Sequence, residues 1–112
     1  MTPAHRELLQ EFQTLSQTAS TAETLMEAMA KHLHEKMTRY NWTGFYLVDP
    51  ADSNFLIVGP YAGSFTPNAR FVNKKLAAEL DIESYFADTF TKAEQDFIES
   101  SATLVAKFLS KG

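Results

Sequence analysis

The stretch of residues 41–50, NWTGFYLVDP, places the strongest constraint on how this 112-residue chain folds. Aromatic and β-branched residues predominate in it and an Asp-Pro pair ends it, so it predicts a β-strand over Trp42–Asp49. Side chains alternate between the two faces of a strand. One face carries Trp42, Gly44, Tyr46 and Val48, and the other carries Thr43, Phe45 and Leu47. Because both faces are largely apolar, we expect a central strand that is covered on both sides.

Gly44, in the middle of this strand, predicts a place where another backbone or a ligand comes close. On the face of Trp42 and Tyr46 the cover is either a small molecule or the rest of the core, since aromatic side chains commonly serve as core. The strand by itself leaves both interpretations open.

Length and composition indicate one small globular domain. A hydrophobic content of 45% with 21% charged residues is typical of a soluble protein. The net charge of −4 argues against a nucleic-acid partner, because phosphate binding needs clustered Lys and Arg. No apolar run approaches membrane-spanning length and the N-terminus is too polar for a signal peptide. We therefore expect no membrane partner and a cytoplasmic location.

The chain contains no cysteine, which excludes disulfides, thiolate metal sites and a cysteine nucleophile from these 112 residues. His32, His34 and Glu35 are close in sequence, but residues two apart do not share a helix face. We expect neither a metal site nor a cofactor, since the metal-binding, phosphate-binding and nucleophile-elbow motifs are all missing.

Three helices are predicted from their start signals. Thr2 followed by Pro is a typical helix start, and an apolar stripe of about three turns follows it. Ser20 with Glu23 fits a capping box before a second amphipathic helix. Thr91 with Glu94 fits another, which opens a last helix through about residue 109.

The remaining segments predict an antiparallel sheet. Residues 55–61 form a second strand beside the first because the connection is short. Residues 71–72 and 76–84, around a turn at 73–74, predict a second hairpin, after a loop at 62–70. Alternation along the last strand places Glu79, Asp81 and Glu83 on one face, which is either a solvated face or a site. The expected class is α+β, an antiparallel sheet flanked by two N-terminal helices and one C-terminal helix.

Four motifs in order resemble a GAF domain, and in particular the free methionine-(R)-sulfoxide reductases. They are NWTGFYLVDP, LIVGPYAG, LDIES and FTKAEQDFIESSATLVAKFL. That family shows Asn-Trp-x-Gly-Phe-Tyr, Leu-Gly-Pro-Phe-x-Gly, Leu-Asp-Ile-Asp-Ser and a Phe-Thr-x-x-Asp/Glu start to its last helix. The resemblance covers residues 41–63 and about 72–109, and it implies a single GAF-like domain over residues 1–112.

The resemblance also implies a site. Trp42 and Tyr46 match aromatic walls of the family's sulfoxide pocket, Asp81 matches one of its acids, and Glu83 stands where its second Asp would be. In such a site a carboxyl group activates the sulfoxide oxygen, a thiolate attacks the sulfur, and an aromatic cage holds the methyl group. Because the two acids lie close together, we expect one of them to have a raised pKa.

The chain departs from the family where the cysteines belong. Asn68 stands in the place of one cysteine, and a longer middle segment that carries the others is missing, so that Arg70 runs directly into Phe71. Glu79 also replaces an apolar residue of the family's Gly-Val-Leu-Asp tract. Either the domain is shortened, or the natural protein has a further segment between Arg70 and Phe71.

Three functions follow as expectations. The first is a non-catalytic GAF domain that binds methionine sulfoxide or a similar small molecule at Trp42, Tyr46, Asp81 and Glu83. The second is an active free methionine-(R)-sulfoxide reductase with a thiol reductant such as thioredoxin, if a cysteine-bearing segment belongs to the protein. The third is a structural or signalling module that forms a homodimer through its first and last helices.

Overall fold

The computed structural model describes residues 1–64 and 70–110. Within these ranges the elements are, in chain order, α1 (Pro3–Thr18), α2 (Ala22–Lys36), β1 (Trp42–Asp49), β2 (Asp52–Gly63), β3 (Arg70–Val72), β4 (Ala78–Glu83) and α3 (Lys92–Ser110).

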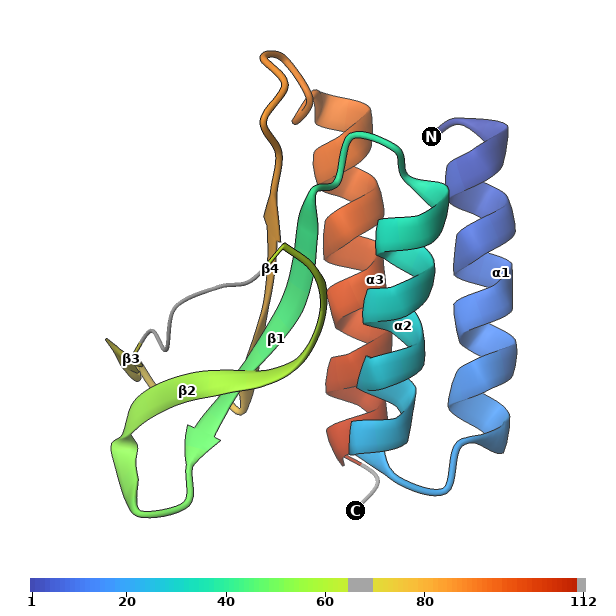
Figure 1. The fold of residues 1–112 in the computed structure, drawn as a ribbon. Helices are drawn as coiled ribbons and strands as arrows, with labels where there is room; N and C mark the ends of the chain where they lie inside the picture. The colour runs from blue at the N-terminus through green and yellow to red at the C-terminus, as the bar shows by residue number, and fades with distance from the viewer. Residues whose placement is uncertain (65–69, 111–112) are drawn as a thin grey trace.

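The strands form one antiparallel sheet in the order β3-β2-β1-β4, and the helices all lie on one side of it (Figure 1). Helices α2 and α3 lie against the sheet, and α1 packs on the outside of these two. The predicted α+β class is confirmed. The predicted central position of Trp42–Asp49 is confirmed as well, because β1 is paired along both edges.

The helix starts follow the predicted chemistry, with one error. Thr2 caps α1 and its hydroxyl accepts a hydrogen bond from the N–H of His5 at 3.2 Å. The capping box predicted at Ser20 is wrong by one residue, because α2 begins at Ala22 and Thr21 provides the cap. The Thr21 hydroxyl accepts a hydrogen bond from the N–H of Thr24 at 3.1 Å, which satisfies a donor that the first turn leaves free.

The main core lies between the helices and the sheet. It contains large apolar side chains from every helix and from β1, among them Leu8, Phe12, Leu25, Met29, Leu33, Phe45 and Phe97. The apolar stripes of α1 and α3 are thus used inside the domain. In residues 1–64 and 70–110, no helix combines the length and the apolar character needed to cross a membrane.

The predicted hairpin of residues 71–84 is wrong. β3 pairs with β2, where Phe55 lies opposite Val72 and Leu56 opposite Phe71. β4 instead pairs with the free edge of β1. This arrangement satisfies backbone hydrogen bonds on both edges of the central strand, which a local hairpin leaves half unpaired. The predicted strand 55–61 is present but longer at both ends, since β2 runs from Asp52 to Gly63. The predicted loop 62–70 is correspondingly shorter, because Arg70 belongs to β3, and its residues 65–69 lie outside the described ranges.

One buried polar contact joins the sheet to the helices. Thr43 is fully buried on the helix side of β1, and its hydroxyl donates a hydrogen bond to the backbone oxygen of Ala30 in α2 at 2.6 Å. A hydroxyl buried without such a partner would cost free energy.

We predict that Thr43→Val lowers the free energy of unfolding by about 1 kcal/mol, because it removes this hydrogen bond while keeping the shape of the side chain. Urea unfolding monitored by circular dichroism measures the change. Thr103→Val is the matched control, since the Thr103 hydroxyl makes a similar bond to Glu99 on the exposed side of α3. An equal effect of both substitutions would contradict the prediction.

Candidate functional site

The face of the sheet turned away from the helices holds the residues that the sequence singles out. β1 and β4 are antiparallel neighbours, so their paired residues point to the same face. The pairs on this face are Trp42 with Glu83, Gly44 with Asp81 and Tyr46 with Glu79. A row of aromatic rings and a row of carboxyl groups therefore lie side by side, and all the predicted site residues are brought together.

The aromatic row is closely packed. Trp42 and Tyr46 are only 2% and 5% exposed, and their ring centroids are 6.1 Å apart. Trp42 stacks on Tyr61 at 5.9 Å, and Tyr46 meets the ring of Phe71 edge-on at 5.0 Å. Together with Leu56 the two buried rings form a second, smaller core. The rings thus serve as core, and a ligand would have to displace a neighbour.

One polar atom in this small core has no hydrogen-bond partner among the described residues. The indole Nε1 of Trp42 is buried, and none of the described residues accepts a hydrogen bond from it. An unpaired donor at such a position costs about 1–3 kcal/mol. A bound molecule with a hydrogen-bond acceptor would remove this cost. A core built only from apolar side chains would have no such cost.

Gly44 provides the space in which the indole lies. A Cβ at this position would lie 2.4 Å from Cη2 of Trp42 and 2.8 Å from Cβ of Tyr61. Only glycine fits at such distances. The close approach expected at Gly44 is therefore real, but the group that approaches is the chain's own aromatic side chains.

The carboxyl groups influence one another. Burial raises the pKa of Asp81 to about 6, and the charge of Glu79, a hydrogen bond with it and the charge of Glu83 add to the shift. Burial and the same three acids raise the pKa of the Tyr46 hydroxyl. The expected raised pKa thus falls on Asp81. Among charged groups, Glu79 has the largest effect on the pKa of Asp81. The resemblance gives Glu79 only as a departure from the family, but the alternation along the strand places it on the same face as Asp81.

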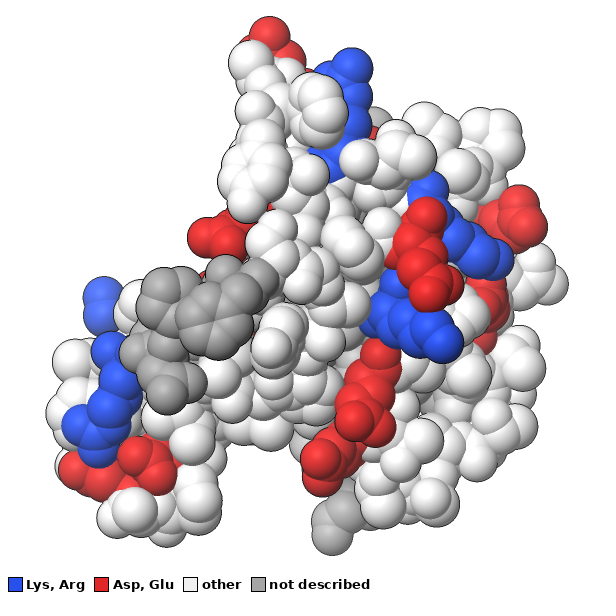
Figure 2. Space-filling view, in the orientation of Figure 1, with Lys and Arg blue, Asp and Glu red and all other residues white. Residues whose placement is uncertain are grey.

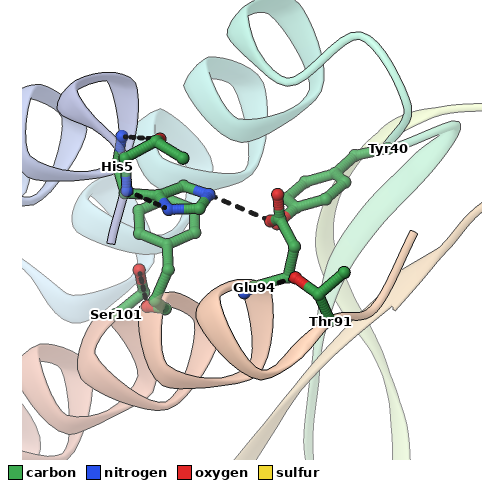
Figure 3. A network of polar contacts seen from close by, with 7 residues as sticks. His5, Tyr40, Thr91, Glu94 and Ser101 are labelled. Atoms are coloured by element: carbon green, nitrogen blue, oxygen red, sulfur yellow. Dashed lines mark hydrogen bonds and ion pairs between the residues drawn. The ribbon is translucent and has the colours of Figure 1, made fainter. Parts of the chain in front are cut away.

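A second polar cluster, at the start of α1 and α3, was not predicted as a unit (Figure 3). The buried His5 accepts a hydrogen bond at Nδ1 from the N–H of Thr2 at 3.1 Å, so its neutral ring carries the proton on Nε2. That Nε2 lies 3.1 Å from Oε2 of Glu94, outside hydrogen-bond geometry, so the contact is electrostatic. The hydroxyl of Tyr40 donates a hydrogen bond to the same oxygen.

This second cluster has a structural role. Burial, and next the hydrogen bond with Glu94, raises the pKa of Tyr40 far above its usual range. His5 also stacks on Phe97 at 4.4 Å, so the cluster joins α1, α3 and the segment before β1. Thr91 accepts a bond from the N–H of Glu94 at 3.4 Å, as predicted, but the Glu94 side chain turns to Tyr40. Such contacts between distant residues leave no signal in a local sequence pattern.

The other histidines contact neighbouring elements. His32 pairs with Glu11 of α1, and Nδ1 of His34 lies 2.9 Å from the backbone oxygen of Tyr40. In the part of the chain that the structure describes, no three His, Asp or Glu side chains are grouped in a way that would hold a metal ion.

The hollows of the described residues include two that lie between the sheet and a helix. An open groove of about 880 Å³ between α2 and β2 is lined by Glu23, Glu27, Lys31, Pro60 and other residues. In Figure 2, acidic and basic side chains follow one another over α2, beside a largely uncharged surface. A second hollow, of about 380 Å³, lies between β4 and the first turns of α3.

Comparison with known proteins identifies the fold. No protein-family model matches the sequence, and no curated protein matches it. Among solved structures, the free methionine-R-sulfoxide reductase of Neisseria meningitidis, in complex with its substrate, superposes with a TM-score of 0.82 at 17% identity, over 98% of this chain and 92% of that one. The reduced form of fRMsr from Staphylococcus aureus gives 0.80 at 17%, over 94% of each chain.

A putative GAF sensor protein of Burkholderia vietnamiensis gives a TM-score of 0.81 at 15% identity, over 94% of this chain and 87% of that one. The GAF fold predicted from the four motifs is therefore confirmed. At these identities the likeness shows the fold alone, and the same fold here includes reductases and a protein described as a sensor.

We predict that Asp81→Asn stabilises the domain at pH 7 and that the gain disappears toward pH 4. The folded-state pKa of Asp81 is raised from 3.8 to about 6, so the folded form holds the proton more tightly and stability falls as pH rises through this interval. Asn mimics the protonated acid. Because the carboxyl is only half-buried, solvent screening limits the gain to the order of 1 kcal/mol.

Urea unfolding at several pH values between 4 and 7 measures this effect. Glu35→Gln, on the exposed side of α2, controls for the loss of one negative charge. A gain that does not depend on pH would contradict the raised pKa of Asp81.

Proposed function

We propose that this chain, which has the fold of GAF domains, binds a small molecule on the face of Trp42, Tyr46, Asp81 and Glu83 without catalysing a reaction. The buried indole N–H of Trp42 carries the proposal, because none of the described residues accepts a hydrogen bond from it. Trp42 belongs to the aromatic row of β1, which lies beside the three carboxyl groups of β4 on the same face of the sheet. A donor, several acceptors and aromatic surfaces are the kinds of group that line small-ligand sites.

The chemistry of the site describes its ligand. An acceptor oxygen would bind the indole N–H of Trp42, a cationic group would pair with Asp81 and Glu83, and an apolar group would contact the rings. Methionine sulfoxide has all three, in its sulfoxide oxygen, ammonium group and methyl group. The Neisseria structure with the same fold holds its substrate, which supports this ligand class. We propose methionine sulfoxide or a molecule with the same arrangement of groups.

The ligand would enter by displacing Phe71. This side chain is 45% exposed, covers the edge of Tyr46, and belongs to the three-residue strand β3 at the sheet edge. Short edge strands are weakly held. Phe71 is therefore the wall of the aromatic cluster that moves at the lowest cost.

Catalysis needs a group that the chain lacks. Reduction of a sulfoxide consumes two electrons, which a thiolate supplies by attacking the sulfur. The 112 residues contain no cysteine, and carboxyl groups transfer protons only. The alternative, an active reductase recycled by a reductant such as thioredoxin, requires a cysteine-bearing segment between Arg70 and Phe71 in the natural protein. A native mass several kilodaltons above 12.6 kDa would favour that alternative.

A homodimer through α1 and α3 stays a prediction. The two helices pack against each other within the domain and already bury part of their apolar stripes there. Light scattering at micromolar concentration measures the state of association, and a monomer would remove this alternative.

We predict that methionine sulfoxide causes a saturable change in the fluorescence of Trp42, the only tryptophan. Asp81→Asn combined with Glu83→Gln should weaken binding at least tenfold, because the ammonium group loses its charged partners. Glu35→Gln should leave the affinity unchanged. Under dithiothreitol the 112-residue chain should bind without forming methionine.

Methionine, which lacks the sulfoxide oxygen, serves as the matched ligand and should bind at least tenfold more weakly. Equal binding of methionine and methionine sulfoxide would show that no acceptor reaches the indole N–H. A flat signal and an unchanged melting temperature with both ligands would reject the proposed site.

A further inference from the structure

The strand β4 is at an edge of the described sheet. Its inner edge pairs with β1 from Ala78 opposite Leu47 to Glu83 opposite Trp42. No described strand pairs with its outer edge. An unpaired edge presents a row of backbone N–H and C=O groups that can accept another strand.

A hollow of about 380 Å³ lies directly beside this edge, between β4 and the start of α3, and its polar lining residues are Asp81, Glu83, Gln95 and Glu99. Leu80 and Ile82 of β4 line it from the sheet, and Phe90 and Ile98 line it from the segment before α3 and from α3 itself. Phe90 is 41% exposed, so part of its ring is accessible to an incoming side chain. A strand added to β4 would direct every second side chain into this hollow.

The other face of β4 is acidic. Glu79, Asp81 and Glu83 project from it at alternate positions, and the chain as a whole carries a net charge of −4. The side chains of an added strand that point to this face would lie next to the three carboxyl groups. Basic side chains are favoured there, because opposite charges on neighbouring strands attract.

A second copy of this chain is a poor occupant of the edge. If two β4 strands paired antiparallel around Asp81, the two Asp81 residues would lie opposite each other, and Glu79 of each copy would lie opposite Glu83 of the other. Like charges directly opposite on neighbouring strands destabilise the pair. The acidic row therefore disfavours self-pairing and leaves the edge open to a partner of opposite charge.

We propose that β4 binds an extended segment of a partner protein as an additional strand, and that this segment alternates apolar with basic residues. The apolar side chains would enter the hollow at Phe90 and Ile98, and the basic ones would lie along Glu79, Asp81 and Glu83. Backbone hydrogen bonds supply affinity and the alternating side chains supply specificity. This partner surface shares the carboxyl groups of Asp81 and Glu83 with the proposed small-molecule site, whereas Phe90 and Ile98 belong to the partner surface alone.

Fluorescence anisotropy tests the proposal with the 112-residue chain and a labelled peptide, Val-Lys-Val-Lys-Val-Lys-Val. A peptide of the same composition with all valines first and all lysines last, and a Val-Glu peptide of the same length, are controls. We expect saturable binding of the alternating peptide alone, weakening at least tenfold from 50 to 500 mM salt, because its lysines face carboxyl groups.

Backbone methylation identifies strand addition. A peptide strand directs the N–H groups of alternate residues to opposite edges. N-methylation of the residues of one parity should abolish binding, and methylation of the other parity should leave it unchanged. If both methylated peptides bind as well as the parent peptide, the peptide is not added as a strand and the proposal fails.

Two exposed phenylalanines of the same segment form a matched pair of variants. Phe90→Ala should weaken peptide binding about tenfold, because Phe90 lines the hollow. Phe86→Ala should have no effect, since Phe86 is 52% exposed and does not line it. Equal effects of the two substitutions, or protection of β4 from hydrogen exchange by a dimer of the free chain, would overturn the proposal.

A separate readout distinguishes this surface from the small-molecule site. Phe90→Ala should leave the response of Trp42 to methionine sulfoxide unchanged. If Phe90→Ala loses peptide binding and keeps the sulfoxide response, the peptide binds at the edge of β4. If it keeps peptide binding and loses the sulfoxide response, the substitution has affected the aromatic face instead.

Discussion

The structure depends on the pairing of β1 along both of its edges. Because β2 and β4 both bind this strand, its Phe45 face is covered by helices and its Trp42 face becomes the floor of a separate small core. The buried hydroxyl of Thr43, bound to the backbone of α2, connects the same strand to the helical layer. Removing β4 from β1 would expose backbone groups and separate the acidic row from the aromatic row at once.

The two rows create an electrostatic conflict that characterises the site. Carboxyl groups held beside aromatic rings and beside each other favour protonation, and the pKa of Asp81 rises accordingly. The indole N–H of Trp42 remains without an acceptor among the described residues. Natural structures rarely bury such groups without a use. The same row of carboxyl groups also disfavours pairing of β4 with the β4 of a second copy. These charges therefore influence both the proposed ligand and the proposed partner.

The secondary structure was largely predictable, because it depends on local signals. Apolar stripes, threonine caps and the alternation of β1 all act over a few residues, and the alternation also placed Glu79 beside Asp81. The wrong hairpin of residues 71–84 has the opposite cause. The local pattern predicted that residues 76–84 pair with residues 71–72 across a turn. In the structure β4 pairs with β1 instead, and the paired residues of these two strands are more than 30 positions apart in the sequence. The contact of His5 with Glu94 escaped prediction for the same reason.

The sequence by itself determined the helices, the central strand, the absence of a thiol, and the residues that form the aromatic and acidic rows. These properties follow from composition and from short-range periodicity, which need no knowledge of distant contacts. Only the tertiary structure decided that the rings close over Gly44 and that Trp42 lacks an acceptor among the described residues. It also decided that no described strand pairs with the outer edge of β4, beside a hollow. These properties depend on which strands meet and on how closely side chains pack, and packing is decided by the whole chain at once.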